Sequence, residues 1–185
     1  MPDDQELMAR VSEGEQSALE QLFARWEGPL FGFFYRLGCP PSAVADLTEE
    51  VLVAVYRQRR RYDIGRPFAP WLYGIARIVW KSHLRRRGRE MRHTAPLEAA
   101  RAVASADLGP AGLTEAREEV SAVRSATQQL PEEQRTVFVL RHYQGLGYQE
   151  IAETLQVPLG TVKWRLHEAV RHLEDTLMAS ERRGA

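Results

Sequence analysis

The sequence has little cysteine, little lysine and no long apolar run. The scarcity of cysteine and of apolar runs excludes several classes of protein. Cys39 is its one cysteine in 185 residues, which excludes an intrachain disulfide and a cysteine-based zinc cluster. No apolar run approaches the roughly 18 residues that a membrane span needs. The first residues, MPDDQELMAR, are acidic and polar, unlike a signal peptide. We therefore expect a cytoplasmic protein with no membrane insertion.

Side chains for catalysis or metal binding are equally scarce. The five histidines are scattered, and His167 and His172 lie about 140° apart around a helix, so they do not share a metal ion. No glycine-rich phosphate-binding motif is evident. No pattern indicates a catalytic arrangement of a nucleophile, a general base and a residue that orients the base. These absences predict a protein that is not an enzyme, with no catalytic residue, cofactor, metal site or small-molecule substrate.

The charge of the chain balances to zero but is unevenly distributed. Residues 1–54 carry ten acidic and three basic side chains, a net charge of −7. Residues 55–93 carry two acidic and twelve basic side chains, a net charge of +10, and residues 94–185 have a net charge of −3. Arginine supplies 23 of the 25 basic residues, and it suits bidentate contacts to phosphates and bases. The basic block predicts a localised anion-binding surface.

Apolar residues recur at helical spacing, and no segment alternates as a strand does. In the first half of the chain they predict helices over about 3–12, 17–37, 43–61 and 71–89. Gly28-Pro29 falls inside the second of these helices and is expected to kink or interrupt it.

The second half begins with an Ala-, Pro-, Gly- and Ser-rich stretch over residues 88–114, which predicts a flexible linker. Two further helices are expected between residues 114 and 144, and residues 179–185 are expected to fray. The predicted fold class is all-α, with two helical domains over residues 1–87 and 115–178.

A helix-turn-helix pattern lies between Gly147 and Leu173. Its first helix is expected at 148–155, and Pro158 opens the second helix. That second helix has one apolar stripe, made of Val162, Leu166, Ala169 and Leu173. Its opposite face carries Gly160, Trp164, His167 and Arg171, flanked by Thr161, Lys163 and Glu168. This face favours docking in a DNA major groove, and the alternative is an ordinary helical hairpin with a solvated face.

Arginines and aromatic residues are interleaved between Arg59 and Trp71, where Gly65, Pro67 and Pro70 predict a loop. This mixture is typical of single-stranded nucleic acid binding, in which cations meet phosphates and rings stack on bases. The next helix carries an outward basic stripe of Arg77, Lys81, Arg85, Arg86 and Arg87. The alternative is a solvated helix end, although charges of nearly one sign repel each other unless an anion is bound.

Three segments together resemble a known family: ADLTEEVLVAVYR (45–57), WLYGIARIVWKSHLRRR (71–87) and the stretch from LPEEQRTVFVLRHYQ to HEAVRHL (130–173). In order and spacing they resemble the group 4, or extracytoplasmic function (ECF), sigma factors of bacterial RNA polymerase in the sigma-70 family. The resemblance implies that residues 1–87 form region 2, which binds core polymerase and opens the −10 promoter element. Residues 115–178 would form region 4, which reads the −35 element.

The resemblance also implies roles for individual residues. The third helix would dock on the clamp helices of the polymerase β′ subunit through Asp46, Leu47, Glu50 and Val51. The −10 element would be held by Arg61, Asp63, Phe68, Trp71, Arg77, Lys81 and Arg85, although Trp71 suits a core position equally well. The −35 contacts would be Thr161, Lys163, Trp164, Arg165, His167 and Arg171, with Arg165 placed to reach a phosphate. Region 4 would also meet the β flap, and an anti-sigma factor would cover both regions.

Three positions depart from the family pattern. Ile78 stands where an Asn is common, Ser82 where an Asp is common, and Trp164 where a small residue, usually Ser, follows TVK. The first two leave open which residues hold the −10 base, and Trp164 indicates an altered −35 preference. The alternative function is a stand-alone helix-turn-helix transcriptional regulator, which would need neither the loop before Trp71 nor a docking face at Asp46. An adaptor or anti-sigma role is a third possibility.

Overall fold

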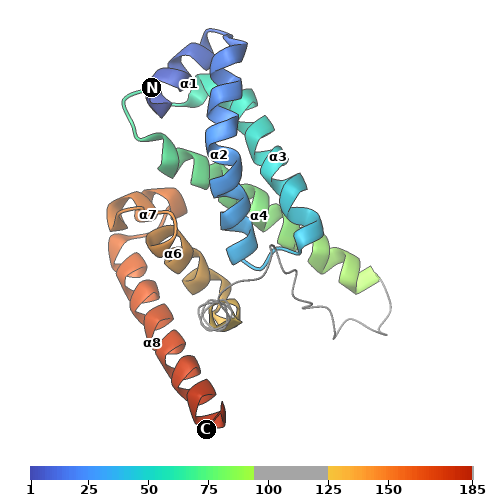
Figure 1. Cartoon of the computed structure of the whole chain (residues 1–185), viewed down its shortest axis with the longest axis vertical. Helices are drawn as coiled ribbons and strands as arrows, with labels where there is room; N and C mark the ends of the chain where they lie inside the picture. Colours follow the sequence, from blue (N-terminus) through green and yellow to red (C-terminus); the bar gives the residue numbers. More distant parts are fainter. Residues whose placement is uncertain (94–124, 185) are drawn as a thin grey trace.

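The structure, a computed structural model, describes residues 1–93 and 125–184, and the part of the chain that it describes contains helices and no strands. The predicted all-α fold is confirmed. The elements are α1 (Asp4–Ser12), α2 (Gln16–Arg36), α3 (Pro41–Gln58), the 3-10 turn η1 (Arg59–Arg61), α4 (Phe68–His93), a short helix at 125–129, α6 (Glu132–His142), α7 (Tyr148–Leu155) and α8 (Leu159–Gly184). Figure 1 shows them in two groups, an N-terminal bundle of α1–α4 and a C-terminal unit of α6–α8.

Local sequence explains where the first helices begin and end. At the start of α1 the Asp3 carboxylate accepts from the Glu6 N–H at 2.8 Å, and the Glu6 carboxylate accepts from the Asp3 N–H at 3.0 Å. This reciprocal pair satisfies two backbone donors that an unprotected helix would leave open. Two residues after the end of α2, Gly38 has a φ of +88°, a left-handed conformation that a glycine adopts without strain and that stops the helix.

Helix α2 runs without a break through Pro29, so the expected interruption at Gly28-Pro29 is not seen. Both residues are exposed. Water can therefore satisfy the carbonyl that Pro29 leaves without a helical donor, while the apolar side of α2 continues to pack.

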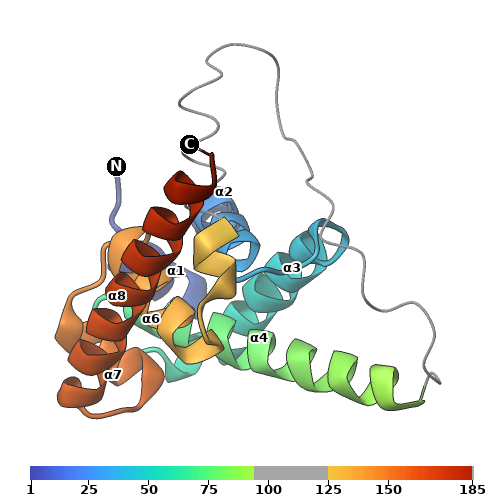
Figure 2. The same ribbon diagram turned by 90° about the horizontal axis from the view of Figure 1, so that it is seen from below.

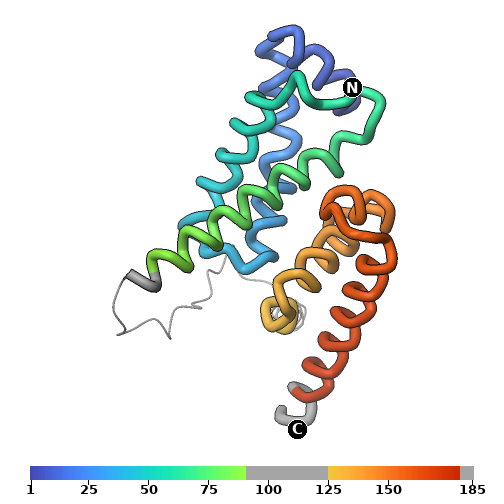
Figure 3. Tube along the Cα trace, turned by 180° about the vertical axis from the view of Figure 1, so that it is seen from behind, coloured from blue at the N-terminus to red at the C-terminus, as the bar shows by residue number. Residues whose placement is uncertain are grey.

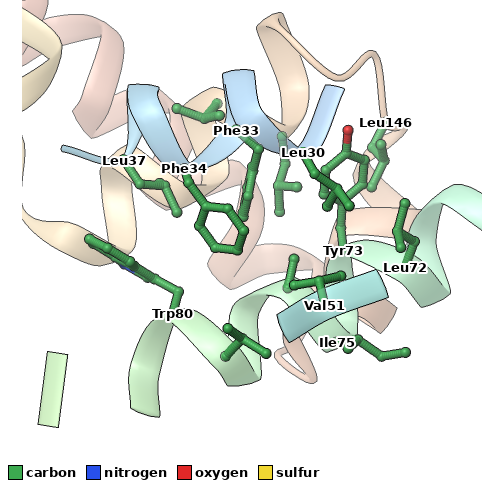
Figure 4. Close-up of a cluster of buried hydrophobic side chains, with 14 of the residues drawn as sticks. Leu30, Phe33, Phe34, Leu37, Val51, Leu72, Tyr73, Ile75, Trp80 and Leu146 are labelled. Carbon is green, nitrogen blue, oxygen red and sulfur yellow. The ribbon is translucent and has the colours of Figure 1, made fainter. Parts of the chain in front are cut away.

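The core of the N-terminal bundle is built from all four helices, α1 through α4. Figure 4 shows Phe33 and Phe34 of α2 and Val51 of α3 meeting Tyr73 and Trp80 of α4. The Phe33 and Tyr73 rings lie 5.1 Å apart between centroids, close enough for a favourable tilted contact. This packing holds α3 and α4 in a fixed relation, which orients the outer faces of both helices.

The two groups of helices share an interface. Figure 4 shows Leu146, from the turn after α6, beside Tyr73 in one apolar cluster. The Tyr73 hydroxyl donates to Gln144 Oε1 at 2.5 Å, and the Thr154 hydroxyl donates to the Pro70 carbonyl at 3.1 Å. Views from opposite sides both place α7 beside the beginning of α4 (Figures 1 and 3).

The helices also extend past the domain limits predicted from the sequence. Helix α4 continues beyond residue 87 to His93, and its last turns project past the bundle (Figure 2). Helix α8 continues beyond residue 178 to Gly184. The predicted linker, residues 88–114, lies mostly outside the described residues. Among the described helices none is both long enough and apolar enough to span a bilayer.

Candidate nucleic-acid interface

The helix-turn-helix forms as the sequence predicts. Helix α7 covers residues 148–155, and its first turn is closed by the Glu150 carboxylate, which accepts from the Gly147 N–H at 2.6 Å. Gln156 ends α7 in a left-handed conformation with φ of +54°, and the Val157 N–H then bonds back to the Ala152 carbonyl at 3.0 Å. The apolar stripe of α8 is buried against α6 and α7 at Val162, Leu166, Ala169 and Leu173.

The opposite face of α8 is open to solvent. Lys163, Trp164, His167 and Arg171 are all exposed, and Thr161 is partly exposed. Arg171 is paired with Glu168 at 2.6 Å, within the same helix. The face therefore presents donors, positive charge and one large ring, which is the chemistry that base edges and phosphates require.

Arg165 is placed differently from the other predicted −35 residues. Its side chain is only 15% exposed, and it donates to the Glu133 carboxylate of α6. It also lines a crevice that contains Arg77 and Lys81 of α4. A phosphate contact by Arg165 remains a prediction, and it requires the Glu133 pair to open.

The loop between η1 and α4 is held by its own hydrogen bonds. Asp63 Oδ1 accepts from the Gly65 N–H at 3.0 Å, and the Arg66 carbonyl accepts from Gln5 Nε2 at 3.0 Å. The Tyr62 hydroxyl also donates to the Arg66 carbonyl. Burial, together with the negative charge of nearby Asp4, raises the pKa of Tyr62 to about 12. Asp63 thus shapes the loop, while Arg61 beside it stays exposed.

Phe68 is a core residue, which corrects its predicted place on the −10 surface. It is 3% exposed and makes edge contacts with Trp26 and Tyr62, at 5.6 Å in each case. A base cannot stack on it without unfolding the start of α4. Trp71 packs against Tyr62 at 5.0 Å between ring centroids and also lines an open cavity, so it is part of the core, and its −10 role stays a prediction.

Helix α4 carries the basic stripe on its outer side. Arg85 is exposed, and Arg77 and Lys81 are half-buried. His83 lies on the same stretch, and burial together with the charges of Arg87 and Arg86 lowers its pKa, so it is neutral near pH 7 and adds no positive charge. The positive charge of this surface therefore comes from arginine and lysine alone.

The C-terminal unit covers part of this surface. An open cavity of about 570 Å³ lies beside the contact of α4 with α7, with Trp71, Arg77 and Ile78 on one side and Glu150 and Glu153 on the other. In a second crevice Arg77 and Lys81 face two acidic residues of α6, Glu132 and Glu133. Acidic side chains of one unit thus stand opposite basic side chains of the other.

A second surface lies on α3, away from the C-terminal unit. Asp46, Glu49 and Glu50 are exposed along a groove of about 450 Å³, which also contains Val53 and Arg57. Glu50 pairs with Arg86 of α4 at 3.2 Å.

Two of the residues predicted for this docking surface are core residues instead. Leu47 is 2% exposed and Val51 is fully buried, and neither lines the groove. Val53 and Arg57 line the same groove but are not among the residues that the sequence predicted for it. Helical spacing could have identified Val53, because seven residues after Asp46 return to the same face of a helix.

The chain was compared with known proteins. Residues 22–90 match the family model described as sigma-70 region 2, and residues 121–173 match sigma-70, region 4. The RNA polymerase sigma-H factor of Pseudomonas aeruginosa is 31% identical over 180 residues, covering 94% of this chain and 93% of that protein. The ECF RNA polymerase sigma-E factor of Escherichia coli K12 is 29% identical over 186 residues, covering 97% of both. The chain belongs to the ECF group of the sigma-70 family.

A solved structure extends the similarity to three dimensions. The structure of CnrH in complex with the cytosolic domain of CnrY has a TM-score of 0.70 and 27% identity, and the match covers 95% of this chain and 97% of that one. As an ECF sigma factor the chain directs promoter-specific initiation of transcription by RNA polymerase. The N-terminal bundle corresponds to region 2 and the C-terminal unit to region 4.

The positions that depart from the family pattern lie on the two outer helices. Ile78 is 63% exposed on α4 and lines the cavity beside α7, whereas Ser82 is half-buried. Trp164 is 59% exposed on α8. Because both apolar side chains face outward, they are available to a partner instead of serving the core.

Proposed function

We propose that this sigma factor acts through three surfaces, each with its own partner. The α3 groove docks on the β′ clamp helices of core polymerase, the start of α4 holds the −10 strand, and α8 reads the −35 duplex while region 4 sits on the β flap. The observation that carries the proposal is the presence in one chain of the exposed α8 face and the basic, aromatic surface of α4. A stand-alone regulator would need only the first.

At the −10 element the single strand lies along α4. Arg61, Arg77, Lys81 and Arg85 neutralise phosphates, and the open side of Trp71 offers a ring on which a base can stack. Unpairing and extruding a base costs a few kcal/mol, which these contacts offset. Asp63 contributes by holding the loop in shape.

Control by a protein partner follows from the same surfaces. The relative CnrH is in complex with the cytosolic domain of CnrY. We infer that an anti-sigma factor likewise binds this chain in the bacterial cytoplasm and withholds it from polymerase. Such a partner competes for the surfaces that polymerase needs.

Reconstitution with core polymerase tests the function directly. The chain should form a stable complex with purified bacterial core polymerase and select −10 and −35 sequences from a randomised promoter library in run-off transcription. If it bound duplex DNA without forming that complex, the stand-alone regulator would replace the sigma factor.

Access to the −10 surface should require region 4 to move. The double variant Tyr73→Phe, Thr154→Val removes two hydrogen bonds between the regions without changing any charge. At about 1 kcal/mol for each bond, the affinity of the free chain for a −10 single strand should rise by up to about thirtyfold. Fluorescence anisotropy with a labelled oligonucleotide from the selected promoter measures this.

The holoenzyme is the control for this prediction, since polymerase holds the two regions apart on the promoter. There the double variant should initiate as the parent chain does. Equal −10 affinity of the free variant and the free parent would show that region 4 does not obstruct this surface.

A further inference from the structure

Trp164 lies on the outer face of α8. It is the sixth residue of the helix and is 59% exposed. One turn earlier is Gly160, where even an added Cβ would meet nothing within 4 Å. The position one turn before Trp164 therefore carries no side chain that could cover it.

A single exposed apolar residue is common on protein surfaces and means little by itself. The position of Trp164 makes it informative, because the N-terminal part of a recognition helix contacts base edges in the major groove. Its neighbours Lys163 and His167 supply the polar contacts. The indole brings a large apolar plane and one N–H donor, and it has no charge for a phosphate.

The four bases differ in what they offer to such a plane. In the major groove all four bases present hydrogen-bonding groups, and thymine alone presents a methyl group beside its O4 acceptor. An apolar side chain buries that methyl group favourably, whereas against a polar edge it would leave donors or acceptors unpaired.

We propose that Trp164 determines −35 specificity by packing on the 5-methyl group of one thymine. The inference rests on the proposed function of α8 and adds the identity of one base to it. A chain with serine at this position would lack the preference, because its hydroxyl can serve as donor or acceptor to several bases.

Replacing thymidine by deoxyuridine tests the inference, since this removes one methyl group and keeps base pairing. Each −35 thymidine of the selected promoter is replaced in turn, and binding by holoenzyme is measured for the parent chain, Trp164→Ser and Trp164→Phe. The parent should weaken about fourfold at one position, the size expected for burying one methyl group. Trp164→Phe should keep this sensitivity and Trp164→Ser should lose it.

Lys163→Ala separates this inference from the function on which it rests. It should weaken binding alike on thymidine and deoxyuridine promoters and lower the salt slope by about one. The inference about Trp164 would be wrong if the parent and Trp164→Ser were equally sensitive to deoxyuridine, or if the selected −35 element contained no thymine. Either result would leave the −35 role of α8 intact. Unchanged binding by both Lys163→Ala and Trp164→Ser would overturn the −35 role of α8 itself.

Discussion

Charge reversal at both Asp46 and Glu50 should weaken binding to core polymerase by at least about a hundredfold, because the proposed docking sets these carboxylates against positive charge on the clamp helices and reversal would oppose like charges. The two carboxylates are exposed on one face of α3, beside a groove whose floor includes Val53. A loss of this size corresponds to about 3 kcal/mol, within the several kcal/mol that like charges cost across an interface. Titration of labelled chain with core polymerase measures it.

Two control variants separate the docking surface from other effects of charge. Glu20→Lys with Glu27→Lys changes the net charge equally on exposed positions of α2, outside the α3 groove, and should bind normally. Glu50→Gln removes the pair with Arg86 without placing two positive charges together, and it should cost less than reversal. If both reversed pairs weakened binding equally, overall charge would explain the result and the α3 face would lose its assigned role.

The parts of the fold that could be predicted from the sequence are those with local causes. Helix α7 covers the predicted residues, because Gly147 and Glu150 define its start and the following turn defines its end. The buried stripe of α8 was also predictable, since helical spacing alone places Val162 and Leu166 on the buried face and Trp164 on the exposed face.

The errors in the candidate site share one physical origin. The resemblance implied that Leu47 and Val51 dock on polymerase and that Phe68 meets the −10 element, yet all three side chains are buried in the core. In a helix adjacent residues point about 100° apart, so neighbours of a surface residue often belong to the core. Phe68 is buried through Trp26, which comes from a different helix and cannot be inferred from the loop itself.

The contact between the two regions depends on pairs that are distant in the sequence. Tyr73 meets Gln144, and Thr154 meets Pro70, without any pattern in the chain that relates one to the other. Helical periodicity shows which side of an element is apolar but does not name its partner. The covering of Arg77 by acidic residues of region 4 was therefore outside the reach of sequence reasoning.

Arg135→Met should lower the free energy of unfolding of region 4 by about 3 kcal/mol, among the larger effects of a single substitution. Arg135 Nε donates to the Thr127 carbonyl at 3.1 Å, and Nη2 donates to the Leu130 carbonyl at 2.8 Å and to the Gln128 carbonyl. These carbonyls lie at the negative end of the helix at 125–129. Burial lowers the pKa of Arg135, yet the guanidinium remains charged at pH 7.

The same side chain joins the two regions, because Arg135 Nη1 donates to the Leu37 carbonyl at the end of α2 at 2.7 Å. Urea unfolding followed by circular dichroism should show region 4 melting first in Arg135→Met, with region 2 little changed. Arg135→Lys should recover little of the loss, since one ammonium group cannot replace the planar guanidinium that donates to carbonyls on two sides.

Arg141→Met is the matched control. Arg141 donates to one carbonyl, that of Leu146, so its replacement should cost about 1 kcal/mol. A loss of that smaller size for Arg135→Met would mean that water replaces the guanidinium at these carbonyls, and that Arg135 does not connect the regions.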